Sequence, residues 1–317
     1  MYRSVIVGCG SISKKHADAI IKSGNILVAA CDADSTALDS FCQKYNCRAY
    51  KDYREMLENE NPDALHICLP HYLHVDVATL ALSKGIAVLL EKPPAISEIS
   101  FAELEKYGDE KLTVCFQNRF NLSTLSAKEI IDSGIYGRLL GANAAVTWNR
   151  YGDYYQKSDW RGKKNKEGGS VLINQAIHTL DLLCVLLGSP TSVKVLSSNL
   201  DHPDTDTEDT LCALIDFDDK RATFFATTCA ASSPPATITL LFEKGRVMLD
   251  SKSLTVLSGA VSKTDYESKT DGKECWGDSH EKIIKEFYNF LDGGENPCSV
   301  SDCKETMDLL FEIYRKV

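Results

Sequence analysis

The N-terminal segment carries the pattern that most restricts how this chain can fold. Residues 2–7 alternate into an apolar strand that leads into a glycine pair, Gly8 and Gly10, and a helix is predicted next. A second apolar run, 26–31, ends on Asp32. The order of strand, glycine turn, helix, strand and acid is typical of the first half of a dinucleotide-binding fold. The competing interpretation is a helix cap with a packing glycine pair.

Each part of this pattern has a physical role in holding a pyrophosphate. Gly8 permits a tight turn, Gly10 lets backbone amides approach phosphate oxygens, and the helix N-terminus supplies partial positive charge. The third glycine of the usual fingerprint is absent, and Ser13 stands in its place, small enough for close helix–strand packing. The turn residues predicted to contact the cofactor are Gly8, Cys9, Gly10, Ser11 and Ile12.

Asp32 favours NAD over NADP as the cofactor. At the end of the second strand its carboxylate can accept hydrogen bonds from a ribose diol, and it should repel a 2′-phosphate. The next residues, Ala33 and Asp34, add no cation that could receive such a phosphate. NAD is therefore the predicted cofactor, with NADP the less favoured alternative.

The rest of the chain predicts an α/β fold in two domains, as its 317 residues allow. Strands and helices alternate strictly to Phe116, which predicts a doubly wound parallel sheet, a Rossmann domain. Beyond Arg119, alternating strands joined by hairpin turns such as Lys244-Gly245 predict a large, mostly antiparallel open sheet. The predicted domains are 1–118, which binds NAD(P), and 119–317, an α/β domain.

One strand end combines an acid, a base and two prolines, in the run Leu89 to Pro94. Proline cannot donate to a strand ladder and an unpaired buried charge is costly, so Glu91 and Lys92 should follow the strand. In an open α/β sheet this edge binds ligands, although a solvated surface turn is the alternative. The strand-end residues predicted to face the cofactor are Leu69, Pro70, His74, Glu91, Lys92, Pro93 and Gln117.

A helix predicted over 171–183 is apolar nearly all round, and hence buried. Its exceptions are Asn174, His178 and Asp181, at spacings that share one helix face. This polar stripe predicts either a face toward a ligand or an internal hydrogen-bond network. With a nicotinamide site already indicated, we favour a ligand-facing His178.

Aromatic residues and an arginine cluster upstream of this helix. Tyr151, Trp160 and Arg161 suit stacking and hydrogen bonding to a sugar or nucleotide, but equally a loop anchored on the sheet. We predict that Arg161 binds the cofactor. We predict that the substrate contacts Lys92, Arg119, Tyr151, Trp160, Asn174 and His178.

Composition argues against several other classes of protein. A net charge of −10 without a basic block disfavours nucleic acid and anionic membranes as partners. No apolar run approaches the roughly 18 residues of a spanning helix, and we expect no signal peptide ahead of residues 5–8. The 12 cysteines form no CxxC pair, and no further ligands cluster with His71 and His74. We expect a cytoplasmic protein with reduced cysteines and no metal.

Four motifs resemble those of the Gfo/Idh/MocA oxidoreductases, named after glucose–fructose oxidoreductase and inositol dehydrogenase. The motifs, spread over nearly the whole chain, are GCGSISKKH, LPHYLH, LLEKPPA and GGSVLINQAIHTLD. The resemblance implies a Rossmann domain followed by an α/β domain whose open sheet mediates assembly into a homodimer or homotetramer. It also implies hydride transfer between NAD(P) and a sugar or cyclitol carbinol.

By this resemblance Lys92 contacts substrate and nicotinamide ribose, and His178 accepts the proton. Asn174 stands where the family usually has a carboxylate, and a neutral amide can orient a hydroxyl but cannot stabilise an imidazolium equally well. The NQ-x-x-H motif, with WRG upstream, is similar to the motif of a subgroup that includes UDP-N-acetylglucosaminuronate 3-dehydrogenases. The resulting expectation is an NAD-dependent dehydrogenase of sugars, including nucleotide sugars. The alternatives are a cyclitol or free-aldose dehydrogenase and a non-catalytic NAD-binding regulator.

Overall fold

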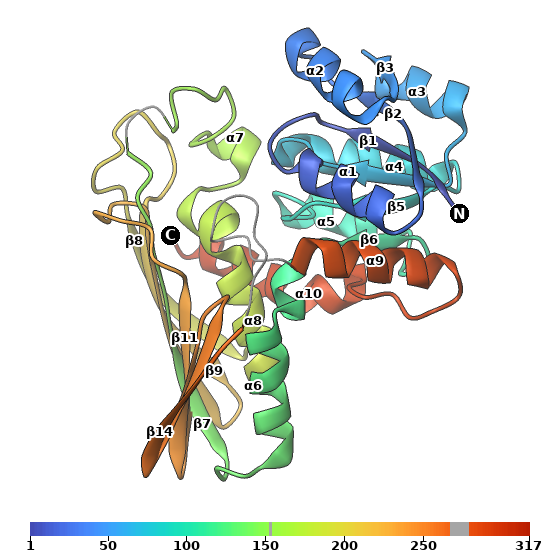
Figure 1. Cartoon of the computed structure of the whole chain (residues 1–317). Coiled ribbons are helices and arrows are strands. Elements are labelled where there is room, and N and C mark those ends of the chain that lie inside the picture. The colour runs from blue at the N-terminus through green and yellow to red at the C-terminus, as the bar shows by residue number, and fades with distance from the viewer. Residues whose placement is uncertain (152–153, 267–278) are drawn as a thin grey trace. The chain divides into compact units, whose positions relative to one another are not determined.

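The computed structural model describes residues 1–151, 154–266 and 279–317 (Figure 1). The chain forms two compact units. The first unit comprises Met1–Phe116 and His280–Cys303, and the second comprises Gln117–Ser279 and Lys304–Val317. The predicted division into 1–118 and 119–317 therefore needs one amendment, because His280–Cys303 pack with the first unit.

The first unit is built on a six-stranded parallel sheet with the strand order β3-β2-β1-β4-β5-β6. This is the order of the Rossmann fold, so the predicted fold class is confirmed. Every residue of the central strands β4 and β5 is buried, as expected where helices cover both faces. The strands are β1 Arg3–Val7, β2 Ile26–Cys31, β3 Arg48–Tyr50, β4 Ala64–Ile67, β5 Ala87–Leu90 and β6 Leu112–Val114.

Helices alternate with these strands, and local signals define several of their ends. The side chains of Asp34, Asp52 and Ser97 accept backbone N–H groups at the starts of α2, α3 and α5. The helices are α1 Ser13–Lys22, α2 Ser35–Tyr45, α3 Tyr53–Glu60, α4 His74–Ser83, α5 Glu98–Glu105 and α9 Ser279–Leu291, with a 3₁₀ turn, η1, at His71–Leu73.

Helix α9 belongs to the first unit because its apolar face is buried there. Ile283 and Phe287 are fully buried. The Tyr288 hydroxyl lies 2.6 Å from Ser4 Oγ of β1 and 2.9 Å from His66 Nε2 of β4. These contacts tie a distant part of the chain to the central strands of the Rossmann sheet.

The second unit contains an eight-stranded sheet with the order β14-β13-β12-β11-β7-β10-β9-β8. Its neighbours are antiparallel except for β7 and β10, which confirms the predicted mostly antiparallel sheet. The predicted hairpin turns lie where expected, between β9 and β10 and between β11 and β12. The strands are β7 Leu139–Thr147, β8 Ser192–Ser198, β9 Thr210–Phe217, β10 Lys220–Thr227, β11 Thr237–Phe242, β12 Gly245–Leu249, β13 Ser253–Ser258 and β14 Ala260–Asp265.

Helices α6 and α8 pack against this sheet (Figure 1). Residues of β10 alternate between buried and exposed, so one sheet face forms a core and the other remains open. The helical segments of this unit are the 3₁₀ turn η2 Gln117–Phe120, α6 Leu122–Ser133, α7 Lys164–Glu167, the π-helical η3 Val171–Ala176 and α8 Ile177–Leu187. The last helix, α10 Val300–Arg315, begins in the first unit and ends in the second.

One helical stretch, Lys164–Leu187, has the length and hydropathy of a membrane span, with a mean hydropathy of 1.6 over its best window. The sequence analysis missed it because polar residues interrupt the apolar run. Within the described residues 83% of that window is buried in the fold. A buried core helix passes the same test, so the stretch is weak support for a membrane span.

Candidate functional site

The glycine turn after β1 has the geometry that a dinucleotide-binding loop requires. Gly8 adopts a φ of 94°, and a Cβ there would lie 2.3 Å from the carbonyl oxygen of Cys68, so no other residue fits. Gly10 is exposed, and a Cβ built on it would meet no described atom within 4 Å. Its backbone is therefore open to an approaching ligand.

Helix α1 presents a free N-terminus to this turn. Ser13, in place of the third glycine, is fully buried and donates its hydroxyl to the Gly10 carbonyl at 2.6 Å. No side chain among the described residues caps the start of the helix. The Lys15 N–H already donates to the Ile12 carbonyl at 2.9 Å, so an anion such as a pyrophosphate would meet the amides that precede Lys15.

Asp32 closes the turn at the end of β2. Its Oδ2 accepts the Cys9 N–H at 2.6 Å and its Oδ1 accepts the Asp34 N–H at 2.8 Å. The fold also brings in a cation that local sequence did not reveal: Lys51 Nζ lies 2.6 Å from Ser35 Oγ and 3.3 Å from the Ala33 carbonyl. The carboxylate suits a ribose diol, with a lysine close to the same strand end.

His74 holds two of the predicted cofactor loops together. The imidazole is fully buried, with Nε2 2.8 Å from the Leu69 carbonyl and Nδ1 2.7 Å from the Pro93 carbonyl. Burial lowers the pKa of His74. The structure thus places His74 beneath the strand ends as a connector, whereas Leu69 and Pro70 are partly exposed.

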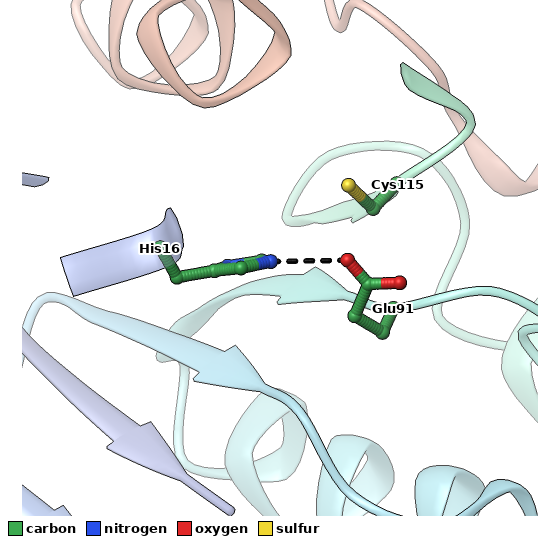
Figure 2. A group of neighbouring side chains, drawn as sticks. All are labelled: His16, Glu91 and Cys115. Atoms are coloured by element: carbon green, nitrogen blue, oxygen red, sulfur yellow. Dashed lines mark hydrogen bonds and ion pairs between the residues drawn. The ribbon is translucent and has the colours of Figure 1, made fainter. Parts of the chain in front are cut away.

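Glu91 points into the first unit rather than outward. Figure 2 shows its carboxylate, just after β5, facing the His16 ring from α1, with the Cys115 thiol nearby. Oε1 lies 3.1 Å from His16 Nε2 and 3.7 Å from His280 Nε2 of α9. Burial alone would raise the pKa of Glu91, but hydrogen bonds from both histidines hold it well below its usual range.

This buried carboxylate also contacts the residue that follows it. The backbone N–H of Lys92 donates to Glu91 Oε2 at 3.3 Å. Because β5 ends at Leu90, Glu91 and Lys92 follow the strand as the sequence predicted. Lys92 is partly exposed and is joined to Pro93 by a cis peptide bond. Glu91 therefore acts as an internal support for the backbone that carries Lys92.

In the second unit, the predicted polar stripe does not run along one regular α-helix. Asn174 lies in the π-helical segment η3, and α8 begins only at Ile177. Asn174 and His178 are partly exposed, whereas Asp181 is fully buried. The wider turn changes the position of Asn174 relative to the other two, and each of the three side chains has its own partner. Such π-helical turns are frequent at functional sites.

Asp181 forms an internal ion pair with Arg119. The guanidinium donates through Nε at 2.9 Å and Nη2 at 2.6 Å, and Thr306 donates its hydroxyl to the same carboxylate at 2.8 Å. The Arg119 side chain is only 14% exposed. This arrangement matches the hydrogen-bond network alternative for Asp181, and it engages the Arg119 side chain that the sequence assigned to substrate.

His178 contacts Gln117 through a side-chain amide. Its Nε2 lies 3.1 Å from Gln117 Nε2, and Gln117 itself is buried. With the amide placed this way the amide nitrogen donates and the ring nitrogen accepts, which requires a neutral imidazole. A neutral, partly exposed histidine is suited to receive a proton.

The predicted aromatic cluster contains a second arginine that the sequence analysis missed. The guanidinium of Arg161 lies 4.7 Å over the Tyr154 ring and 5.1 Å over Trp160. Arg150 lies 5.3 Å over the same Tyr154 ring and donates to Gln175 Oε1 at 3.0 Å. Its position directly before Tyr151 was the available signal.

Tyr151, by contrast, is anchored to the loop. Its hydroxyl donates to the Cys229 carbonyl at 3.0 Å, and its ring stacks on His202 with centroids 5.6 Å apart. Trp160 and Arg161 remain partly exposed. The cluster thus combines residues that can meet a ligand with residues that fix the loop.

Glu167 is a buried carboxylate that the sequence analysis also missed. It accepts hydrogen bonds from the Gly162 N–H and from Asn174 Nδ2. Burial raises the pKa of Glu167 to about 7. The only signal in the sequence was an acid directly before Gly168 and Gly169, which resembles an ordinary loop acid.

Two groups within the described residues, one buried and one with a partly exposed cysteine, bring histidine, carboxylate and thiol together at distances that a metal ion could span. They are His16, Glu91 and Cys115, and His202, Asp209 and Cys229. Burial raises the pKa of Cys115 well above its usual value and that of Cys229 to about 11. In each group the histidine already bonds the carboxylate, and we assign both groups to structural hydrogen bonding.

Together, the Rossmann sheet, the open glycine turn and Asp32 define an NAD-binding protein. Comparison with family models matches residues 2–115 to the oxidoreductase family with an NAD-binding Rossmann fold. Residues 124–248 match the GFO/IDH/MocA C-terminal domain. The chain belongs to the Gfo/Idh/MocA oxidoreductase family.

Named relatives and a solved structure are consistent with this membership. The WlbA dehydrogenase from Bordetella pertussis, solved with NADH and UDP-GlcNAcA, is 30% identical with a TM-score of 0.86; the match covers 99% of this chain and 95% of that one. D-glucoside 3-dehydrogenase of Escherichia coli K12 is 32% identical over 59% of this chain, and inositol 2-dehydrogenase of Salmonella typhimurium is 27% identical over 57%. The chain matches about half the length of these two relatives, 54% and 53%.

Proposed function

We propose that this protein is a dehydrogenase that interconverts a secondary alcohol and a ketone on a sugar derivative with NAD. The observation that carries the proposal is Lys92, a partly exposed ammonium held directly past the end of β5 in a Rossmann sheet. The carboxyl ends of these strands are where such sheets bind their ligands. A lysine there can hold the oxygen on which the reaction takes place.

The cofactor proposal rests on the fit of the glycine turn. The open backbone at Gly10 and the uncapped start of α1 would hold the pyrophosphate, and Asp32 would hold the adenosine ribose. The nicotinamide would supply the two-electron redox chemistry. Of the other predicted cofactor residues, Cys9, Ser11 and Ile12 lie in the same turn, whereas Glu91 and His74 are buried near the strand ends and Gln117 belongs to the second unit, where it contacts His178.

The protein's own residues would move the proton of the reacting hydroxyl. His178, which contacts Gln117, would accept that proton, and Lys92 would donate a hydrogen bond to the reacting oxygen. Asn174 would orient the hydroxyl. In the direction of ketone reduction the same groups return the proton.

We favour a nucleotide sugar as the substrate. Arg150 and Arg161 lie over aromatic rings in the substrate-side unit, and arginine with aromatic faces suits phosphate and base recognition. The similarity to a structure solved with UDP-GlcNAcA supports the same class. A cyclitol or a free aldose is the second candidate, favoured by the similarity to inositol 2-dehydrogenase.

We also propose a cytoplasmic homo-oligomer assembled through the open face of the second sheet. Phe225 of β10 and Met248 of β12 are exposed, although a sheet face directed to water is usually polar. A second copy of the sheet would cover them. Light scattering after gel filtration would report the mass, and Phe225→Glu should reduce it to that of a monomer.

The function is tested by incubating the protein and NAD with UDP-sugars, inositols and free hexoses and following NADH absorbance. We expect turnover with a UDP-sugar. Lys92→Ala and His178→Ala should each reduce kcat by about 10²–10⁴-fold, the usual contribution of a positioned proton-transfer group. Lys106→Ala, at an exposed lysine on the same unit, is the matched control and should retain activity. NAD binding without turnover of any substrate would favour the regulator alternative.

A further inference from the structure

The side chain of Asn174 has a fixed direction because its partner is a carboxylate. Glu167 is fully buried, and its Oε1 receives a hydrogen bond from Asn174 Nδ2. An ionised carboxylate accepts hydrogen bonds but cannot donate them, so the amide nitrogen must face Glu167. The amide oxygen, Oδ1, is then directed away from Glu167. While Glu167 is ionised, this requirement resolves the usual ambiguity between the two ends of an amide.

Glu167 is itself held in place on its other oxygen. The backbone N–H of Gly162 donates to Oε2, so both carboxylate oxygens have a partner. Glu167 ends the short helix α7, and Asn174 lies on η3, four residues before His178. The hydrogen bond therefore joins two successive helical segments at the beginning of the helix that carries His178.

We propose that Glu167 is a positioning residue of the active site. It supplies through Asn174 the negative charge that a carboxylate at position 174 would supply directly. The ionised Glu167 polarises the Asn174 amide, which makes Oδ1 a stronger acceptor for a substrate hydroxyl. The inference rests on the proposed function, since it assigns a role in the same substrate site.

The charge on Glu167 depends on the groups that surround it. Burial most strongly disfavours the ionised form, and the neighbouring Glu208 adds to this effect. The hydrogen bonds from Gly162 and Asn174 and the charge of Arg161 favour ionisation, and the net effect raises the pKa of Glu167 to about 7. The Tyr155 and Tyr314 hydroxyls also interact with it electrostatically. Below pH 7 the carboxyl becomes protonated and can itself donate, so its hold on the amide orientation is lost. Acceptor strength at Asn174 should therefore decline as the pH falls through 7.

The test exchanges the carboxylate of Glu167 and the amide of Asn174, first singly and then together. Glu167→Gln keeps the shape but removes the charge, and we expect kcat to fall about tenfold at pH 8, with KM changed less. The limb of the pH profile near 7 should disappear in this variant. Asn174→Asp places two carboxylates in contact and should reduce kcat by at least as much. The double variant E167Q/N174D restores one amide and one carboxylate, and should regain activity to within a few-fold of the parent.

The matched control is Glu129→Gln, at an exposed glutamate of α6, which should leave both kcat and the pH profile unchanged. A purely structural role predicts losses that multiply in the double variant. The proposal is overturned by that result, or by a Glu167→Gln enzyme with the parent kcat and pH profile. If Glu167→Gln does not fold, Asn174→Asp must still abolish the limb near pH 7, or the proposal is wrong.

A carboxyl titration separates this inference from the proposed function. In protein labelled with ¹³C at glutamate carboxyls, one resonance should titrate near pH 7 without any substrate, and should be missing in Glu167→Gln. Asn174→Asp should move that titration to higher pH, because two adjacent carboxylates resist joint ionisation. Failure of every substrate to turn over would refute the function but leave this titration intact. Absence of the titration in an active enzyme would refute only the inference.

Discussion

Two buried glutamates, one in each unit, lie in electrostatic environments that shift their pKa values in opposite directions. Glu91 meets two histidine rings, and its pKa is held well below the usual range. Glu167 meets a backbone N–H and a neutral amide with Glu208 nearby, and its pKa is raised to about 7. Burial opposes ionisation of both carboxylates. The difference lies in whether the partners can carry positive charge.

This contrast separates two uses of a buried acid. A carboxylate paired with groups that can become cationic stays ionised at all working pH values and contributes a permanent link, here between α1, α9 and the end of β5. A carboxylate that accepts hydrogen bonds from neutral groups, as Glu167 does from the Gly162 N–H and the Asn174 amide, can titrate where cells operate. Glu91 is therefore a structural support of Lys92, whereas Glu167 can respond to pH.

The largest expected effect is on stability in the first unit. Glu91→Ala leaves His16 and His280 without their shared acceptor in a buried position, and breaking such a pair costs on the order of 3–5 kcal/mol. Urea unfolding followed by circular dichroism would measure this loss. An unchanged midpoint would show that the histidines do not depend on Glu91.

A second prediction concerns the change in folding stability that a Glu→Gln substitution causes, which should have opposite signs at the two glutamates. The carboxyl of Glu167 titrates at about 7 in the fold against 4.5 ordinarily, so the native state binds more protons between these values. Stability should therefore fall as pH rises from 4.5 to 7, and Glu167→Gln should be more stable than the parent at pH 8 by on the order of 1–3 kcal/mol.

Glu91→Gln should behave in the opposite way. Its depressed pKa means that the ionised form stabilises the fold above the ordinary value of 4.5, and this contribution is lost as pH falls through the lower native pKa. Glu91→Gln should thus be less stable than the parent at pH 8. Urea midpoints for both variants at pH 5 and pH 8 would check both predictions. Stability changes of the same sign in the two variants at pH 8 would contradict the proposed difference between the glutamates.

A smaller effect concerns a third carboxylate, Asp32, which is only half-buried. Asp32→Ala should shift the ratio of kcat/KM for NADP to that for NAD by about tenfold in favour of NADP, because the repulsion of a 2′-phosphate is removed. Lys51→Ala in that background should reverse part of the gain if Lys51 contacts the phosphate. Initial rates with both cofactors decide this, and an unaltered ratio would exclude Asp32 as the selecting residue.

Strand and helix alternation was sufficient to predict the parallel sheet and its glycine turn. The same reasoning missed β3 and β14, which lie at sheet edges, and β13, which pairs with β14 and β12. An edge strand has a partner on one side only and needs less apolar sequence, so its periodicity is weak. The assignment of helix α9 to the first unit depends on contacts with Ser4 and His66, which are distant in sequence.

The candidate site was predictable where local chemistry is unusual, as at Lys92 and His178. It was not predictable where a role depends on packing. The stripe argument assumed a regular α-helix through Asn174, whereas the π-helical turn changes the spacing. Arg119 looked available to substrate until the fold paired it with Asp181. Tertiary contacts place Glu167 and Lys51 in the candidate site, and no sequence motif predicts those contacts.

The most direct test of the central claim is transfer of an isotope from substrate to cofactor. A UDP-sugar deuterated at its carbinol carbons would be incubated with the protein and NAD. The mass of the NADH formed would be measured by mass spectrometry. The account predicts NADH that carries one deuterium, formed by the parent protein and almost absent with Lys92→Ala. Turnover that yields unlabelled NADH, or equal labelling with Lys92→Ala, would contradict it.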